Sequence, residues 1–137
     1  LWSREVNTTT DVVRESAAET VRVVWSAMHG VCDTLQRALA REGLAYAIAT
    51  QLSGPSRYTT ELTPDETVTV IDAMEVIGDT RITGDIAGVL FGDATAVAMG
   101  WTPLGIPEYA GYRWAVAHSM RQLQQASAAE VLRANVG

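Results

Sequence analysis

Two glutamates border apolar helical stripes, where a carboxylate needs either a partner or a chemical role. Glu42 shares a predicted helix face with Leu39 and Tyr46, so its side chain is expected to be buried. Burying an ionised carboxylate is costly unless the group is paired, hydrogen-bonded or bound to a metal. Glu19 lies on the preceding predicted helix, also next to an apolar stripe. These two carboxylates are the first candidates for chemistry.

Carboxylates in a partly apolar pocket can have raised pKa values and act as general acid or base. Tyr112 follows Gly111 near the start of a later helix and could add a hydroxyl group to the same site. The catalytic candidates are therefore Glu19, Glu42 and Tyr112. An isomerisation, a cyclisation or a hydrolysis would suit such a set.

Other side chains could bind the substrate of this site. Arg22 follows Glu19 by three residues, and its planar fork suits a carboxylate. Apolar walls with a few converging polar groups are the usual form of a small-molecule site. The substrate-binding candidates are Arg22, Tyr46, Trp101 and Trp114. The simpler interpretation of the aromatic residues is that they belong to the core.

The pattern of caps and apolar spacing predicts an all-α fold, a compact bundle of about five helices. The helices are expected at residues 10–28, 33–52, 64–77, 84–91 and 107–125, with a short terminal helix after Ser127. Gly43 lies inside the second helix, which suggests a packing or site reason for it. Residues 92–107 are expected to form a Gly- and Pro-rich loop that covers a pocket between the first, second and fifth helices.

Composition describes a single globular domain over residues 1–137. The chain has 47% hydrophobic and 19% charged residues and a net charge of −6, which does not suit nucleic acid. All ten basic residues are Arg, which fits a high-GC bacterial coding sequence. The longest apolar stretch is interrupted by Gly and Pro, so no membrane span is expected. The single Cys32 favours a cytoplasmic protein.

Four blocks of the sequence, in order, resemble the DUF2268 family of predicted zinc-dependent peptidases. They are residues 34–45 (TLQRALAREGLA), 90–92 (LFG), 106–112 (IPEYAGY) and 128–132 (AAEVL). The resemblance covers roughly residues 16–132. It implies a gluzincin-like helical core without the N-terminal sheet region of the family.

The resemblance also implies that the zinc site has been lost. Ala18 and Arg22 stand at the positions of the two zinc-binding histidines, Glu19 at that of the general base and Glu42 at that of the third ligand. Ala18 has no donor atom. Two unit charges about 4 Å apart repel by about 4 kcal/mol at an effective dielectric constant of about 20, so the permanent charge of Arg22 opposes a divalent ion. We therefore expect no metal and no cofactor. By the same alignment we expect Arg22 to occupy the former metal position and to form an ion pair with Glu42, Glu19 or both.

The leading hypothesis is a metal-free relic of the peptidase fold that binds a small molecule or acts on it, and the sequence does not separate an enzyme from a binding protein. One alternative is an active zinc peptidase in which His29, His118 and a carboxylate converge. Another is a non-catalytic helical domain that binds a partner chain, and a homo-oligomer remains open. No nucleic-acid or membrane partner is expected.

Overall fold

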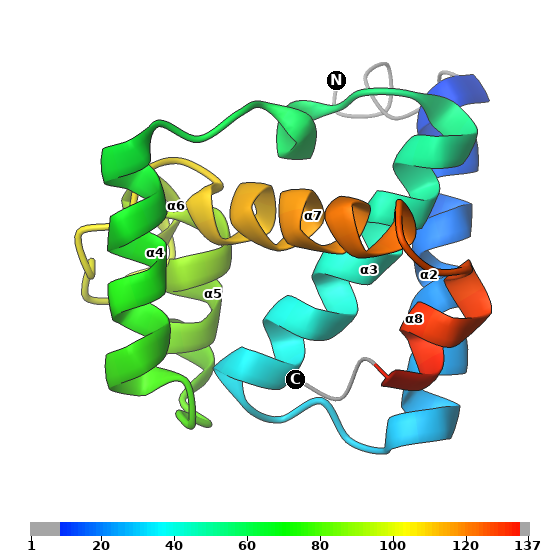
Figure 1. Ribbon diagram of the computed structural model, residues 1–137. Helices are drawn as coiled ribbons and strands as arrows, with labels where there is room; N and C mark the ends of the chain where they lie inside the picture. The colour runs from blue at the N-terminus through cyan, green and yellow to red at the C-terminus, as the bar shows by residue number, and fades with distance from the viewer. Residues whose placement is uncertain (1–8, 135–137) are drawn as a thin grey trace.

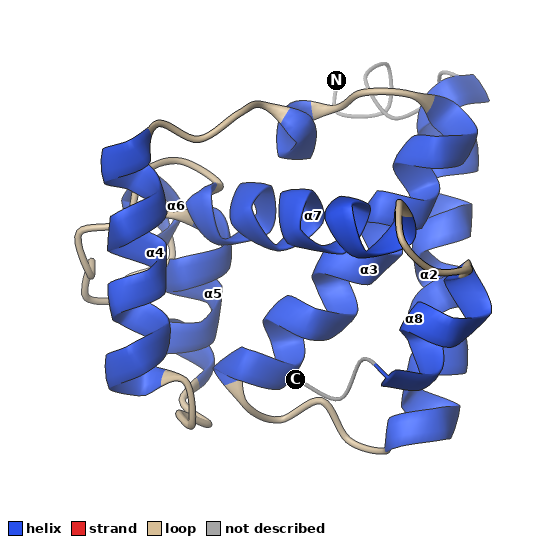
Figure 2. Cartoon of the chain, in the orientation of Figure 1, coloured by secondary structure: helices blue, strands red, loops and turns tan. Residues whose placement is uncertain are grey.

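The computed structural model describes residues 9–134. Within that range the regular secondary structure consists of helices joined by loops, with no strand (Figures 1 and 2). The elements are α2 (Thr9–His29), α3 (Leu35–Ser53), the 3-10 helix η1 (Arg57–Thr59), α4 (Pro64–Ile77), α5 (Thr83–Phe91), α6 (Asp93–Ala98), α7 (Ala110–Leu123) and α8 (Ala128–Ala134). The predicted all-α fold is confirmed. No helix in this range is both long and apolar enough to cross a bilayer.

Helix α3 is the centre of the molecule. It packs most extensively on α2 and α7, and Figure 1 shows α7 crossing in front of it, with α4 and α5 toward one side and α2 and α8 toward the other. More than half of its residues are buried, around most of its circumference. A helix that is enclosed in this way cannot keep a clean polar face. Glu42 is therefore inside the protein because of where α3 lies.

Two glycines allow helices to approach closely. A Cβ atom on Gly43 would lie 2.6 Å from the backbone oxygen of Ala115, and one on Gly111 would lie 2.3 Å from that of Val89. Both distances are far below a van der Waals contact. The packing reason expected for Gly43 is thus confirmed, since α3 and α7 touch backbone to backbone at this point.

Side-chain caps fix several helix starts. The Thr34 hydroxyl accepts a hydrogen bond from the backbone N–H of Arg37 at the start of α3. Thr63 and Glu66 form a reciprocal capping box at α4, with Pro64 in the first turn. The helix limits predicted from these signals lie within two residues of the observed ones for α2, α3, α4 and α5.

The segment expected as an irregular loop over residues 92–107 is different. Its first part is helix α6, and its second part is held by Asp93, whose Oδ1 accepts hydrogen bonds from the N–H groups of Leu104, Gly105 and Ile106 at 2.9–3.2 Å. The next helix, expected from residue 107, begins at Ala110. Tyr109 has a left-handed φ of 53° just before it, which separates α7 from the preceding turn.

Candidate functional site: a buried ion-pair cluster and a neutral pocket

The carboxylate of Glu42 lies at the centre of a hydrogen-bond cluster and is only 4% exposed. Arg22 from α2 donates from Nε to Oε2 at 2.9 Å and to Oε1 at 3.1 Å, and from Nη2 to Oε1 at 2.9 Å. Arg41 Nε donates to Oε2 at 3.1 Å, and the Tyr112 hydroxyl of α7 donates to Oε1 at 2.8 Å. Both carboxylate oxygens are therefore occupied.

Arg22 connects this cluster to the surface. Its Nη1 donates to Glu19 at 3.2 Å, and its Nη2 donates to the hydroxyl of Tyr46 at 3.1 Å. The hydroxyl of Tyr46 in turn donates to Glu15 at 2.7 Å. The prediction that Arg22 forms an ion pair with Glu42, Glu19 or both is confirmed, since Arg22 contacts both carboxylates. We call Glu15, Glu19, Arg22, Arg41, Glu42, Tyr46 and Tyr112 the Glu42 cluster.

Electrostatics keep Glu42 ionised. Burial is the largest single influence and by itself raises the pKa of the carboxyl group. The hydrogen bonds and charge of Arg22, with smaller contributions from Tyr112 and Arg41, outweigh it, so the pKa of Glu42 lies below its ordinary value. Burial and the adjacent Glu42 charge raise the pKa of Tyr112, which stays protonated and donates. At neutral pH Glu42 therefore stays ionised and Tyr112 stays protonated.

The candidate catalytic residues share none of the four main pockets of residues 9–134. Glu42 and Tyr112 line none of these four, and Glu19 borders the shallow hollow on the outer surface of α2. Trp101 packs against α5, where a Cβ atom on Gly84 would lie 3.1 Å from its ring. Tyr46 contacts the ring of Tyr112 edge-on at 5.6 Å between centroids.

The residues at the positions of the family's zinc ligands do not fit a zinc ion. Ala18 is fully buried and has no donor atom, and the guanidinium of Arg22 occupies the oxygens of Glu42. The alternative set does not converge either, because His29 bonds through Nε2 to the Leu132 carbonyl at 2.7 Å. No group of three or more His, Cys, Asp or Glu side chains in the described chain could hold a metal.

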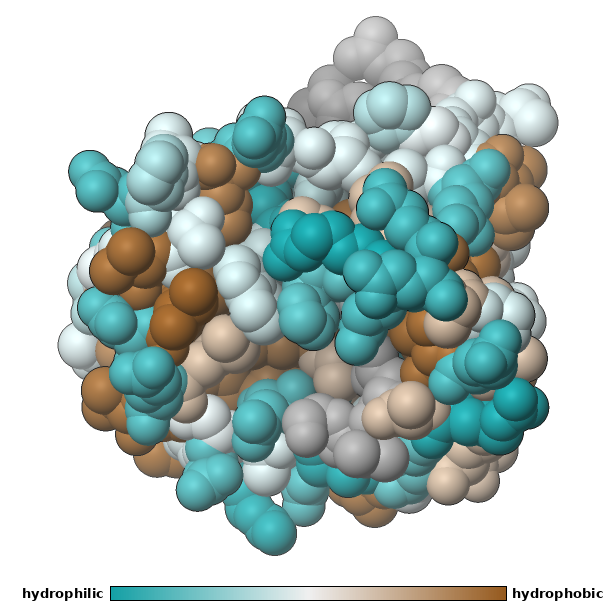
Figure 3. All heavy atoms as spheres, viewed as in Figure 1, coloured by the Kyte–Doolittle hydropathy of each residue, from teal (hydrophilic) through white to brown (hydrophobic). Residues whose placement is uncertain are grey.

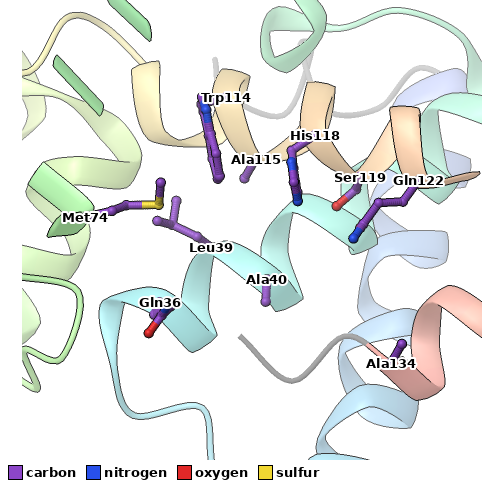
Figure 4. Close-up of a pocket in the computed structure, with 10 residues that line it drawn as sticks. All are labelled: Gln36, Leu39, Ala40, Met74, Trp114, Ala115, His118, Ser119, Gln122 and Ala134. Atoms are coloured by element: carbon purple, nitrogen blue, oxygen red, sulfur yellow. The ribbon is translucent and has the colours of Figure 1, made fainter. Parts of the chain in front are cut away.

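A second site lies between α3, α4, α7 and α8, and Figure 4 shows it in close-up. It is a pocket of about 310 Å³. Its lining consists of Gln36, Leu39, Ala40, Met74, Trp114, Ala115, His118, Ser119, Gln122 and Ala134. None of these residues is an acid or an arginine. Of the predicted site residues, only Trp114 belongs to it.

Helix α7 supplies most of the polar groups of this neutral pocket. Trp114 and His118, one turn apart, stack with their rings 8° from parallel and 5.0 Å between centroids. Burial, and then the charge of Arg121, lower the pKa of His118, so its imidazole is neutral at pH 7. Ser119 follows on the same side, and Gln122 comes one turn after His118 (Figure 4).

Ser119 is the most informative residue of the neutral pocket. It is only 2% exposed, and its hydroxyl points from α7 toward the pocket and α3 (Figure 4). Its hydroxyl makes no hydrogen bond to another residue within 9–134, but it is not a sealed polar atom, because Arg14 Nε is the fully buried side-chain atom without a partner in that range. Gln36, His118 and Gln122 are exposed where they line the pocket. All four polar groups can therefore pair with water or with a ligand that enters the pocket. Sequence reasoning missed them, although the spacing of residues 115, 118, 119 and 122 places them on one helix face.

No known family model matches the chain, and neither the curated proteins nor the solved structures give a match.

Proposed function

We propose that this protein binds a small uncharged molecule in the neutral pocket between α3, α4, α7 and α8. The observation that carries the proposal is Ser119, a residue only 2% exposed whose hydroxyl faces the pocket and makes no hydrogen bond to another described residue. A ligand that pairs with this hydroxyl takes the place of water in the pocket.

The lining favours a ligand with both donor and acceptor groups. The amides of Gln36 and Gln122 each offer a carbonyl oxygen and an NH₂ group, and the neutral imidazole of His118 offers one donor and one acceptor. No lining side chain within residues 9–134 carries a formal charge at pH 7, so a charged ligand would lose its hydration without gaining an ion pair with them. The volume of about 310 Å³ is at the small end of the usual range for ligand pockets.

In this proposal the Glu42 cluster is structural. It stands where the resemblance to DUF2268 peptidases would place the zinc, and we propose that the chain is a metal-free relic of that helical core. Arg22 would then replace the metal as the cation that joins α2 to α3. The hydrogen bond from Tyr112 to Glu42 connects α7 to the same pair of helices. A cytoplasmic location is part of the proposal, because the lone Cys32 has no second cysteine to pair with.

A titration followed by ¹H–¹⁵N NMR tests the binding site. Nicotinamide, 2-pyridone and uracil are suitable probes, since each is small, planar and uncharged and carries both donors and acceptors. At least one of them is expected to shift the indole N–H of Trp114 and the amide signals of Gln36, Ser119 and Gln122. Ala40→Leu, which places extra carbons in the pocket, is expected to weaken that binding at least tenfold.

The matched control is Glu19→Gln, which changes the Glu42 cluster at an exposed position and leaves the neutral pocket intact. Binding that survives Ala40→Leu, or shifts that gather on Glu42, Tyr46 and Tyr112 instead, would contradict the proposal. The second outcome would return the function to the acid–base site that the sequence suggests.

A further inference from the structure

Helix α2 presents an uncharged face to solvent along most of its length. It packs chiefly on α3, and Figure 1 shows it at the edge of the molecule. The exposed residues of this outer face are Val12, Val13, Ser16, Thr20, Val23, Val24 and Ala27. Its four valines are 40–61% exposed. Exposed apolar residues are common singly, but a continuous uncharged helix face marks an interaction surface.

Helix α4 provides a contrast within the same molecule. Its exposed apolar residues are Val68, Ile71 and Val76, and the exposed acids Asp72 and Glu75 lie among them. Figure 3 shows this mixture at the left, where brown side chains alternate with teal ones. Charges among the apolar side chains are typical of a face that stays in water. On α2 the exposed acids Glu15 and Glu19 lie along one edge of the face instead of among its valines.

We propose that the outer face of α2 binds the same face of a second copy, with the two helices antiparallel. The order of residues on the face is nearly symmetric about the level of residue 18. In an antiparallel pair with its two-fold axis at that level, Val12 meets the partner's Val24, and Val13 meets the partner's Val23. A two-fold interface requires this self-complementarity, because each contact occurs twice with the partners exchanged.

The residues nearest the axis allow the two helices to come close. Ser16 meets the partner's Thr20 there, and both side chains are small. The Thr20 hydroxyl already donates to the carbonyl oxygen of Ser16 at 2.9 Å, so burying it leaves no unpaired donor. A shallow hollow on this side of α2 is lined by Glu15, Ser16, Glu19, Thr20, Val23 and Val24.

The area of the α2 face determines how tightly the two copies are expected to bind. Residues 12–27 of a helix span roughly 22 Å, and two such faces bury on the order of 1,000 Å² in total. That is near the lower limit for specific interfaces. We therefore expect a dimer with a dissociation constant on the order of 10–100 µM, present in concentrated solution and lost on dilution.

Sedimentation equilibrium of the 137-residue chain over that concentration range tests the proposal with a pair of charge variants. Val13→Glu/Val23→Glu places like charges opposite each other and is expected to weaken association at least tenfold. Val13→Lys/Val23→Glu carries as many new charges, but in the antiparallel pair opposite charges meet. It is expected to associate at least tenfold more tightly than the first variant.

The control for surface charge is Val76→Glu on α4, at a site that is 81% exposed, and it should leave the monomer–dimer equilibrium unchanged. All three variants change exposed positions, so circular dichroism should show native helix content. A chain that stays monomeric at several hundred micromolar would overturn the proposal. Equal weakening by both double variants would also overturn it, because it would exclude the antiparallel pairing.

Discussion

At the scale of single residues, Glu42 and Ser119 are the two buried polar residues of the described chain. Glu42 accepts hydrogen bonds from two arginines and a tyrosine. The Ser119 hydroxyl makes no hydrogen bond within residues 9–134 and faces the pocket. The first arrangement favours stability, since the carboxylate has all its partners within the protein. The second favours binding, since the hydroxyl can pair with a molecule that enters the pocket.

Replacing Glu42 with alanine is expected to destabilise the protein by about 3–5 kcal/mol, because it leaves the partly buried Arg22 and the Tyr112 hydroxyl without their acceptor. Chemical denaturation followed by circular dichroism measures the change. Glu19→Ala is the matched control, since its side chain is 66% exposed and its ion pair with Arg22 contributes about 0.5 kcal/mol or less. Equal midpoints for the two variants would contradict the structural role of Glu42.

The pH dependence of ligand binding is expected to follow His118. Burial lowers its pKa below the ordinary value of 6.5, so the imidazole is neutral throughout the neutral range and begins to charge only on acidification. Affinity for a neutral probe should be constant between pH 7 and pH 8 and should fall on acidification as the imidazole becomes charged. Calorimetric titration measures it, and His118→Gln should remove the acid decline. An affinity that changes between pH 7 and 8 would point to another group.

At the scale of elements, α3 is the central helix of the fold because it contacts other helices on most of its sides. One consequence is that it holds residues for both sites. Glu42 and Tyr46 face α2 and α7 in the cluster, while Gln36, Leu39 and Ala40 face the pocket. A change in how α3 crosses α7 therefore alters both sites together.

Gly43→Ala tests this crossing. The new Cβ atom would lie 2.6 Å from the Ala115 backbone oxygen, so we expect the variant to lose about 1–3 kcal/mol of stability from overpacking, despite the better helix propensity of alanine. Gly88→Ala is the control, because its Cβ atom meets only the Leu104 side chain at an ordinary 3.6 Å. That variant should be neutral or stabilised by up to about 1 kcal/mol. Thermal unfolding compares them, and a Gly43→Ala protein as stable as wild type would show that the helices can separate at no cost.

At the scale of the whole molecule, the Glu42 cluster joins residues that are far apart in the chain. Arg22, Glu42 and Tyr112 come from three helices, and their hydrogen bonds close the bundle around α3. The stability of the whole domain should therefore depend on the ionisation of a single buried carboxylate.

Acid unfolding measures this dependence. The pKa of Glu42 is lowered in the folded state, so its contribution is fully present above the ordinary carboxyl pKa of about 4.5 and is lost as the pH falls through the lower folded value. We expect wild-type stability to decline below about pH 5 more steeply than that of Glu42→Gln, which keeps the shape without the charge. Parallel denaturation curves at pH 3–7 compare the two proteins. Identical slopes would mean that other carboxylates control acid unfolding.

The sequence by itself determined where the helices form, that Glu42 is buried and that it pairs with Arg22. Caps such as Thr63 with Glu66 act over three or four residues, so their effect can be predicted without knowing the rest of the chain. The apolar neighbours of Glu42 indicated burial, and a buried carboxylate requires a cation. Its pairing with Arg22 was predicted from position through the family resemblance, and the geometry bears it out.

Only the tertiary structure determined where the pocket lies and which distant residues meet. Glu15, an exposed residue of α2, accepts a hydrogen bond from the hydroxyl of Tyr46 on α3. Residues 92–107 form α6 and a turn held by Asp93, because the carboxylate oxygen captures backbone N–H groups eleven or more residues away. The neutral pocket depends on how α3, α4, α7 and α8 cross. Crossing geometry arises from contacts between distant segments, such as Gly43 against Ala115, and helical periodicity describes only which side of each helix is apolar.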